Sequence, residues 1–222
     1  MTKFDGRTKT AALKQLDESL QRLQTDVIDL WQFHENIRLE DPDRFFAEGG
    51  AVEAVQEAKK TGKIKFVGFT GHKDPSVHLR MLEMAEKRNF SFDAVQMPLN
   101  VMDAHFRSFG TEVLPILVRK QIAVLGMKSM GAGTILRSNT ASALECLQYA
   151  LSLPTSVVIT GIDSMENLEQ AFTAAKTYSA LSKADIDGIL AKTAVAAAHG
   201  QFEPFKTGTM FDGTAHNPDW LG

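Results

Sequence analysis

Short apolar runs of β-favouring residues alternate along the chain with longer stretches in which apolar residues recur every three or four positions. The short runs predict buried strands at Val27–Phe33, Ile64–Phe69, Asp93–Met97, Ile122–Leu125 and Val157–Thr160. The longer stretches predict helices at Thr10–Leu23, Ala51–Lys60, Ser76 to about Lys87, Phe109–Arg119, Thr140–Leu151, Glu166–Ala175, and Ser182 to about Ala198. Strands that alternate with helices indicate parallel pairing with right-handed crossovers.

Polar residues and prolines mark where these elements begin or break. Ser76 is placed to cap one helix, and Ser182–Asp185 fits a capping box before the last one. Pro115 predicts either a kinked helix or two shorter pieces. The stretch Ile37–Gly50 is predicted to be a loop, and Phe202–Gly222, which has no apolar period, an extended tail.

Composition narrows the class of protein without giving its chemistry. The 222 residues are 44% hydrophobic and 23% charged, as in ordinary soluble globular proteins. A net charge of −3 gives no attraction to nucleic acid or an anionic membrane, and no apolar run approaches the roughly 20 residues that span a bilayer. The single cysteine, Cys146, excludes an internal disulfide framework, and the histidines show no metal-ligand spacing. We expect a cytoplasmic protein.

Two architectures fit five strand–helix repeats. A doubly wound sheet lacks its expected sign, because no Gly-x-Gly-x-x-Gly follows the first strand. A (β/α)₈ barrel needs three more units, or about 90 residues at roughly 30 per unit, and only 26 residues precede Val27. Either the fold is not a barrel, or its first part is missing.

The first predicted strand ends in a polar group. His34 and Glu35 follow the apolar run Val27–Phe33, where a strand would pass into a loop. In parallel α/β sheets and barrels, catalytic groups collect at the carboxyl ends of the strands. This position predicts that His34 lies on a catalytic face.

Five segments, in consistent order along the chain, resemble successive parts of one family. They are Asp26–His34, Gly62–Thr70, Asp93–Gln96 with Asn100, Gly126–Gly131, and Ile159–Leu168. They are similar to strands four to eight of the aldo-keto reductases, which are (β/α)₈ TIM barrels that reduce carbonyls with NAD(P)H. The resemblance implies an α/β fold in which about strands 4–8 and their helices are present. It divides the chain into a partial barrel over residues 1–200 and a tail over 201–222.

The resemblance also implies catalytic roles. His34 would orient the carbonyl, and Thr2-Lys3 resembles the end of the third strand, which carries the catalytic lysine. In the family a Tyr supplies the proton, and the lysine lowers the pKa of that Tyr. The acid Tyr and its Asp lie further upstream in the family, whereas Tyr149 and Tyr178 follow later strands. We therefore expect the first two strands and most of the third to be absent.

NADP or NAD is the cofactor that the resemblance implies, with NADPH slightly favoured. Gln96 matches the family's contact to the nicotinamide carboxamide, and Gly71-His72 replaces a Ser-Asn pair there, so that His72 either donates to the carboxamide or lies at a loop surface. Met127 stands where many members stack an aromatic ring. The phosphate loop Lys128–Gly133 offers backbone N–H groups and a cation through Lys128, Ser129, Gly131 and Gly133.

The adenosine end is expected to lie around the eighth strand. The residues that the resemblance places there are Gly161, Asp163, Ser164, Asn167 and Gln170. Asp163 can accept from a ribose 2′-hydroxyl or repel a 2′-phosphate, so the choice between NAD and NADP stays open.

The sequence thus predicts an NAD(P)H-dependent oxidoreductase that reduces aldehyde or ketone carbonyls to alcohols. Without the acid Tyr, the short chain itself is expected to be inactive. A non-catalytic nucleotide-binding or regulatory protein on the same scaffold, and an inactive gene fragment, are the alternatives. The expected partners are a small carbonyl substrate and, through open sheet edges, a second copy of the chain.

Overall fold

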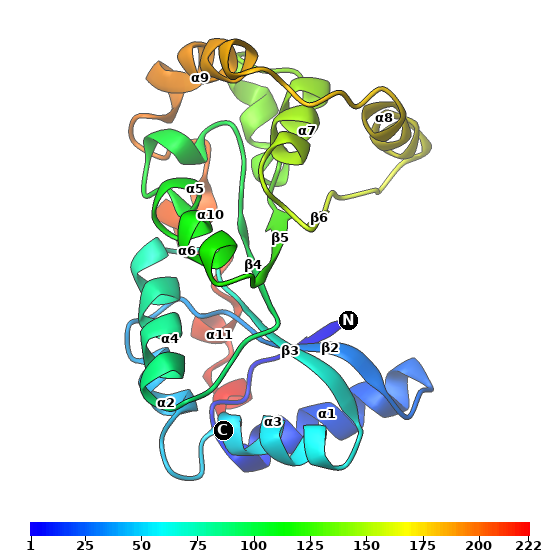
Figure 1. The fold of residues 1–222 in the computed structure, drawn as a ribbon, viewed down its shortest axis with the longest axis vertical. Coiled ribbons are helices and arrows are strands. Elements are labelled where there is room, and N and C mark those ends of the chain that lie inside the picture. The colour runs from blue at the N-terminus through cyan, green and yellow to red at the C-terminus, as the bar shows by residue number, and fades with distance from the viewer. The chain divides into compact units, whose positions relative to one another are not determined.

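The computed structural model describes residues 1–222, which form two compact units. The first unit comprises Met1–Val95 together with Met210–Gly222, and the second comprises Gln96–Thr209. Both units are built from strands that alternate with helices (Figure 1). The alternation confirms the predicted α/β class.

Three parallel strands form the sheet of the first unit in the order β1 (Thr2–Phe4), β2 (Ile28–Phe33) and β3 (Ile64–Thr70). Lys3 lies opposite Gln32, and Gln32 lies opposite Gly68. The strands β2 and β3 confirm two predicted runs. The short strand β1 lies where the resemblance implied the end of a strand.

An aromatic layer covers one face of this sheet. The ring centroids of Phe4 and Trp31 are 4.0 Å apart, those of Phe4 and Phe33 are 4.8 Å apart, and those of Phe33 and Phe45 are 4.7 Å apart. All four rings are almost fully buried. Because successive side chains of a strand point to opposite faces, Lys3 and Gln32 belong to the other face.

The helices of the first unit are α1 (Lys9–Leu23), α2 (Asp41–Phe45), α3 (Ala51–Lys60) and α4 (Pro75–Lys87). The helix α3 has the predicted bounds. The interpretation of Ile37–Gly50 as a loop was wrong where α2 forms, since Pro42 suits a first helical turn. The expected cap Ser76 was also wrong: Asp74 caps α4 and accepts the amide of Ser76 at 2.9 Å.

The second unit holds the strands that follow. They are β4 (Ala94–Pro98), whose first residues lie in the first unit, β5 (Ala123–Met127) and β6 (Val157–Val158), in that order. The strands β5 and β6 are parallel, with Leu125 opposite Val157. The predicted strand Val157–Thr160 is therefore only two residues long.

Helices and short 3₁₀ turns surround these strands. The helices are α5 (Phe109–Glu112), α6 (Leu114–Arg119), α7 (Ala143–Ser152), α8 (Met165–Lys176) and α9 (Lys183–Ala197), and the 3₁₀ turns are η1 (Asp103–His105), η2 (Gly131–Gly133) and η3 (Ile135–Ser138). Two pieces around Pro115 and a capping box at Ser182 confirm those predictions. Cys146 belongs to the apolar core of this unit.

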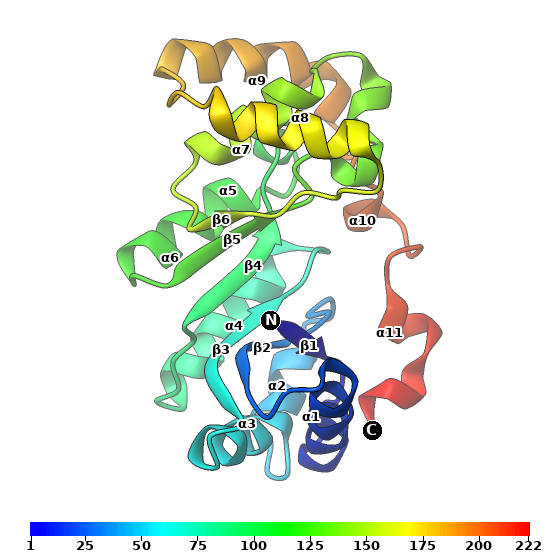
Figure 2. The same cartoon turned by 90° about the vertical axis from the view of Figure 1, so that its right-hand side faces the viewer.

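The end of the chain is folded, so the prediction of an extended tail was wrong. It contains α10 (Pro204–Thr207) in the second unit, and α11 (Gly213–His216) and η4 (Pro218–Leu221) in the first. Phe205 and Leu221 are buried and give this segment its apolar anchors. Figures 1 and 2 both show the C-terminal end beside α1, where Gln15 donates to the carbonyl of Trp220 at 2.9 Å.

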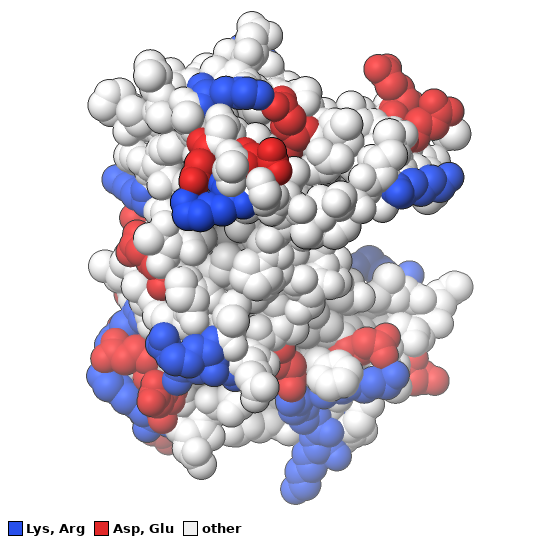
Figure 3. Space-filling model, turned by 45° about the horizontal axis from the view of Figure 1, so that its top comes forward, with Lys and Arg blue, Asp and Glu red and all other residues white.

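Charged side chains of both signs are interspersed on the face of the molecule drawn in Figure 3. The ion pairs of the molecule include partly exposed ones such as Lys65 with Asp29 and Lys192 with Glu145. None of the helices combines the length and the apolar character that crossing a bilayer requires.

Candidate functional site

His34 and Lys3 lie on the same face of the first unit's sheet. Lys3 is paired with Gln32, and His34 stands two residues beyond Gln32, so alternation turns all three side chains away from the aromatic layer. The backbone continues the pairing past the strand end, because the amide of His34 donates to the carbonyl of Phe4 at 2.9 Å. The carboxyl ends of β1 and β2 therefore bring together the two residues that the sequence predicted as catalytic.

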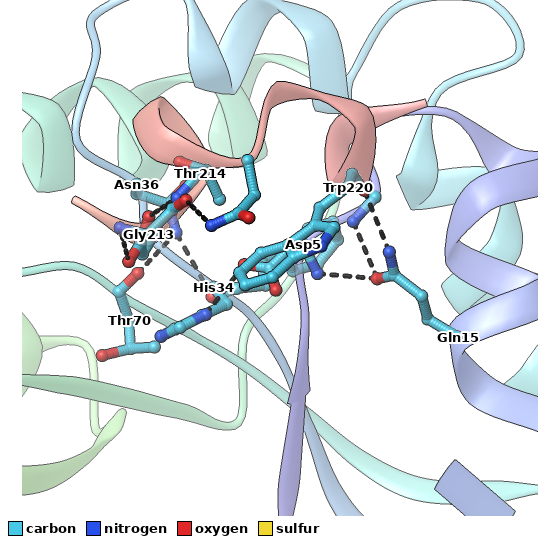
Figure 4. Close-up of polar contacts among 12 residues, drawn as sticks. Asp5, Gln15, His34, Asn36, Thr70, Gly213, Thr214 and Trp220 are labelled. Carbon is cyan, nitrogen blue, oxygen red and sulfur yellow. Dashed lines mark hydrogen bonds and ion pairs between the residues drawn. The ribbon is translucent and has the colours of Figure 1, made fainter. Parts of the chain in front are cut away.

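Asp5 is the immediate partner of His34 (Figure 4). Its Oδ1 lies 2.8 Å from His34 Nδ1, and the two side chains are 21% and 34% exposed. Sequence reasoning missed Asp5. The available signal was its position directly after β1 and two residues beyond Lys3, which places it on the same face.

Asp5 also acts on Lys3. Burial lowers the pKa of Lys3, and the negative charge of Asp5 opposes that shift. Lys3, Asp5 and His34 thus form one electrostatic cluster, in which a carboxylate lies within the field of two potential cations.

A buried arginine fixes the backbone beneath this cluster. Arg7 donates to the carbonyl oxygens of Asp5 at 2.7 Å, His34 at 3.1 Å and Glu35 at 2.8 Å. Its guanidinium also pairs with the buried carboxylate of Asp41 at 3.1 Å. Five donors in a rigid fork suit such a junction, so Arg7 joins the strand ends that carry the cluster.

The C-terminal segment packs on the same strand ends. Glu35 accepts the amides of Gly213 at 2.7 Å and Thr214 at 2.6 Å. Gln15 accepts the amide of Asp5 at 2.8 Å and donates to Trp220. These contacts place residues 210–222 at the carboxyl ends of the strands.

Gly71 and His72 follow β3. A side chain at position 71 would place its Cβ only 2.3 Å from the carbonyl oxygen of Asn36, which explains a glycine there. His72 is 7% exposed, and its Nε2 lies 3.2 Å from Asp212, which also pairs with Lys73 at 2.8 Å. The ring is therefore buried under the C-terminal segment rather than at a loop surface.

Gln96 and Met127 come together in the second unit. Both stand near the carboxyl ends of their strands, and Gln96 Nε2 lies 3.1 Å from Met127 Sδ. A thioether is a weak acceptor that also packs readily against rings. The pair has the chemistry expected for a carboxamide contact beside an apolar ring.

The loop Lys128–Gly133 has an unusual backbone. Lys128, Gly131, Ala132 and Gly133 all have positive φ, between 57° and 83°. The amides of Gly131 and Gly133 donate to the carbonyls of Lys128 and Met130 at 2.8 and 2.9 Å. These two amides therefore close turns of the loop itself, which removes them from the N–H groups expected to meet a phosphate.

The other two groups that the sequence predicted for an anion in this loop are the ammonium of Lys128 and the hydroxyl of Ser129. The amine of Lys128 lies 5.6 Å from the ring centroid of Phe205, and burial lowers the pKa of Lys128. Ser129 is 3% exposed. A half-buried ammonium is a suitable group for an anion.

The residues predicted for the adenosine end gather at the start of α8. Ser164 caps the helix and accepts the amide of Asn167 at 3.1 Å, while Asn167 Nδ2 lies 2.5 Å from Asp163. Gly161 is exposed, and Gln170 lies one turn further along the helix. This arrangement gives a helix N-terminus with one carboxylate beside it.

The two tyrosines lie in the second unit, where Tyr178 follows α8 and is not part of a helix. Tyr149 is buried in α7, and burial raises its pKa to about 12. The hydroxyl of Tyr178 donates to the carbonyl of Leu151 at 3.1 Å. Neither belongs to the unit that holds His34.

The sequence profile of the Aldo/keto reductase family matches residues 1–144. Among relatives, the oxidoreductase YcsN of Bacillus subtilis is 26% identical over 147 residues, which cover 64% of this chain and 45% of that protein. L-galactose dehydrogenase of Arabidopsis thaliana is 40% identical over 58 residues, which cover 26% of this chain and 17% of that one. The chain thus spans less than half of the length of these relatives.

Solved structures show the same fold. The aldo-keto reductase AKR11C1 of Bacillus halodurans, in its holo form, superposes with a TM-score of 0.64 at 21% identity, covering 88% of this chain and 71% of that one. An aldo/keto reductase from Brucella melitensis gives a TM-score of 0.64 at 17% identity, with 86% and 72% covered. The parallel α/β arrangement therefore matches that of aldo-keto reductase barrels.

Proposed function

The chain belongs to the aldo/keto reductase family, and we propose that it serves the NAD(P)H-dependent reduction of aldehyde or ketone carbonyls to alcohols. The observation that carries the proposal is the cluster of Lys3, Asp5 and His34 at the carboxyl ends of β1 and β2. Cations and ring N–H groups at such a position stabilise negative charge that develops on a carbonyl oxygen.

The residues of the second unit have a donor set that suits a nicotinamide nucleotide. Gln96 beside Met127 offers an amide and an apolar contact, and Lys128 with Ser129 offers a cation and a hydroxyl. The N-terminus of α8, capped by Ser164, favours an anion. When bound, the reduced nucleotide supplies the hydride that adds to the carbonyl carbon.

Asp163 is the residue that bears most directly on the choice between NADH and NADPH. Its carboxylate contacts Asn167 and lies at the same helix terminus. A carboxylate accepts from a ribose 2′-hydroxyl and repels a 2′-phosphate, so this residue favours NADH, whereas the family resemblance favours NADPH. Replacing Asp163 by Asn is expected to raise the affinity for NADPH relative to NADH, measured by fluorescence titration of both.

Turnover of simple aldehydes, followed by NADH and NADPH absorbance, tests the activity. Because no tyrosine matches the family's acid, we expect negligible reduction by this chain, and any residual turnover should fall at least 100-fold in His34→Ala, since loss of such a group typically costs about 10²–10⁴-fold. His199→Ala is the matched control, because His199 is an exposed histidine after α9. Equal rates in His34→Ala and the parent chain would contradict the proposal. Nucleotide binding without turnover would favour the non-catalytic alternative.

A further inference from the structure

A distant segment of the second unit packs against the loop Lys128–Gly133. The hydroxyl of Thr134, directly after the loop, lies 2.6 Å from the carbonyl oxygen of Phe202, 68 residues further along the chain. A side chain at position 131 would place its Cβ only 3.0 Å from the same oxygen, which favours glycine there. The segment Phe202–Lys206, here called the strap, therefore lies close against the turn that ends the loop.

The strap also carries the aromatic ring that meets the cation of the loop. The ring centroid of Phe205 is 5.6 Å from the ammonium of Lys128, within the roughly 6 Å over which the negative face of a ring attracts a cation. Phe205 is fully buried and Lys128 is half-buried, so water screens this attraction only weakly. Burial lowers the pKa of Lys128, whereas a nearby ring face favours the charged form. The ring therefore helps to keep an ammonium at this position.

Buried charges fix the strap from its other side. The ammonium of Lys206 lies 2.7 Å from the carboxylate of Asp103 and 2.9 Å from that of Glu203. It also donates to the carbonyl of Phe106 at 2.8 Å. Breaking such a network is costly, because it leaves buried charges unpaired. The ring next to Lys206 in the chain is therefore a fixed support, whereas the side chain of Lys128 is long and flexible.

We propose that Phe205 is a positioning residue for anion binding, whose ring holds the ammonium of Lys128 at the end of β5, where the diphosphate of the proposed nucleotide would meet it. The amides of Gly131 and Gly133 close turns of the loop, so the loop attracts an anion mainly through that ammonium. Fixing a flexible side chain before binding reduces the entropy that binding costs. The inference rests on the proposed function and adds a residue to its nucleotide site.

Calorimetric titration of the full chain with inorganic pyrophosphate tests the site without a nucleotide. Replacement of Phe205 by trifluorophenylalanine nearly preserves the shape of the ring and withdraws negative charge from its face. We expect the affinity for pyrophosphate to fall roughly three- to tenfold, as for the loss of a cation–π contact. Lys128→Met should lower the affinity further, because it removes the cation itself. A role of Phe205 in apolar packing alone would leave the affinity of the fluorinated chain unchanged.

Phe109 provides the matched control. Its ring is also fully buried and lies 5.6 Å from the ammonium of the other buried lysine, Lys206. Fluorination at Phe109 should leave the affinity for pyrophosphate unchanged. Proton spectra of the chain without ligand give a second measurement, since the ring current of Phe205 should shift the methylene signals of Lys128. That shift should disappear in Phe205→Leu and persist in Phe109→Leu.

Three results would overturn the inference. They are equal affinities of the parent chain and the chain fluorinated at Phe205, an equal loss on fluorination at Phe109, and no binding of pyrophosphate to the parent chain. Titration with NADH and NADPH decides the proposed function separately. Pyrophosphate binding without nucleotide binding would overturn that function and leave the role of Phe205 standing. Nucleotide binding without pyrophosphate binding would do the reverse.

Discussion

Each unit of the molecule contains one fully buried cation at a place where a segment distant in sequence packs against strand ends or loops. The two cations have different surroundings. In the first unit, Arg7 faces one carboxylate, Asp41, and three backbone carbonyls. In the second unit, Lys206 faces two carboxylates, Asp103 at 2.7 Å and Glu203 at 2.9 Å, and the carbonyl of Phe106.

The count of charges decides how each network responds to pH. In the first network the carboxylate of Asp41 faces two guanidinium groups, those of Arg7 at 3.1 Å and Arg38 at 3.7 Å, so negative charge is not in excess. One ammonium cannot balance two buried carboxylates, and burial raises the pKa of Asp103 and raises that of Glu203 to about 7. The second unit therefore contains a carboxyl group, Glu203, that titrates near neutral pH.

The largest expected effect tests the first network. Asp41→Ala leaves the guanidinium of Arg7 buried and unpaired, which typically costs about 3–5 kcal/mol of unfolding free energy. It also removes the acceptor for the amides of Ile37 and Arg38. Urea denaturation of the parent chain and the variant measures the loss.

Asp43→Ala is the control for that experiment. Asp43 lies on the same short helix and pairs with Arg80 at 2.7 Å, but both side chains are partly exposed. Surface pairs contribute about 0–1 kcal/mol. A similar loss in both variants would show that disruption of α2, and not the buried charge, sets the cost.

The second prediction concerns pH and Glu203. A carboxyl whose pKa rises from 4.5 to about 7 on folding binds more protons in the folded state between those values. Stability from this group is therefore present below pH 4.5 and is lost as pH rises toward 7, by roughly 3 kcal/mol at 1.4 kcal/mol per pKa unit.

Urea denaturation at pH 5 and pH 8 tests this sign. Between pH 5 and pH 8, the free energy of unfolding of the parent chain should fall by the contribution of Glu203. In Glu203→Gln, which has no titrating group at this position, the fall should be smaller by about that contribution. Glu169→Gln, at an exposed position of α8, should follow the parent chain. An unchanged pH dependence in Glu203→Gln would mean that Asp103 holds the proton instead.

Local pattern predicted most of the fold. Apolar periods gave the strands β2 and β3 and the bounds of α3, because burial of one face and helix capping act over a few residues. The segment Phe202–Gly222 was mistaken for an extended tail. Its helices have only four residues each and are held by contacts such as Lys206 with Asp103 and Thr214 with Glu35, which lie 103 and 179 residues apart.

The candidate site was also predicted from the sequence only in part. Lys3 and His34 were predicted from strand ends and a family resemblance, and the β1–β2 register places them on one face. Asp5 and Arg7 were missed, although both follow β1 directly. A carboxylate or arginine after a strand is common at protein surfaces, and only the paired structure shows that one contacts an imidazole and the other is buried.

The smallest effect concerns a carboxylate that is held by backbone amides instead of a cation. Glu35 accepts the amides of Gly213 and Thr214 at the start of α11. Glu35→Gln leaves one acceptor atom and removes the charge, which should cost about 1–2 kcal/mol, near the value of a hydrogen bond to a charged group. Since α11 is short, the loss should be local: hydrogen exchange should speed up at Gly213 and Thr214 before the rest of the unit changes.

Glu48→Gln, at an exposed site in the same unit, is the control. Faster exchange throughout the unit in Glu35→Gln would instead mean that the C-terminal segment folds together with the strand ends that carry His34.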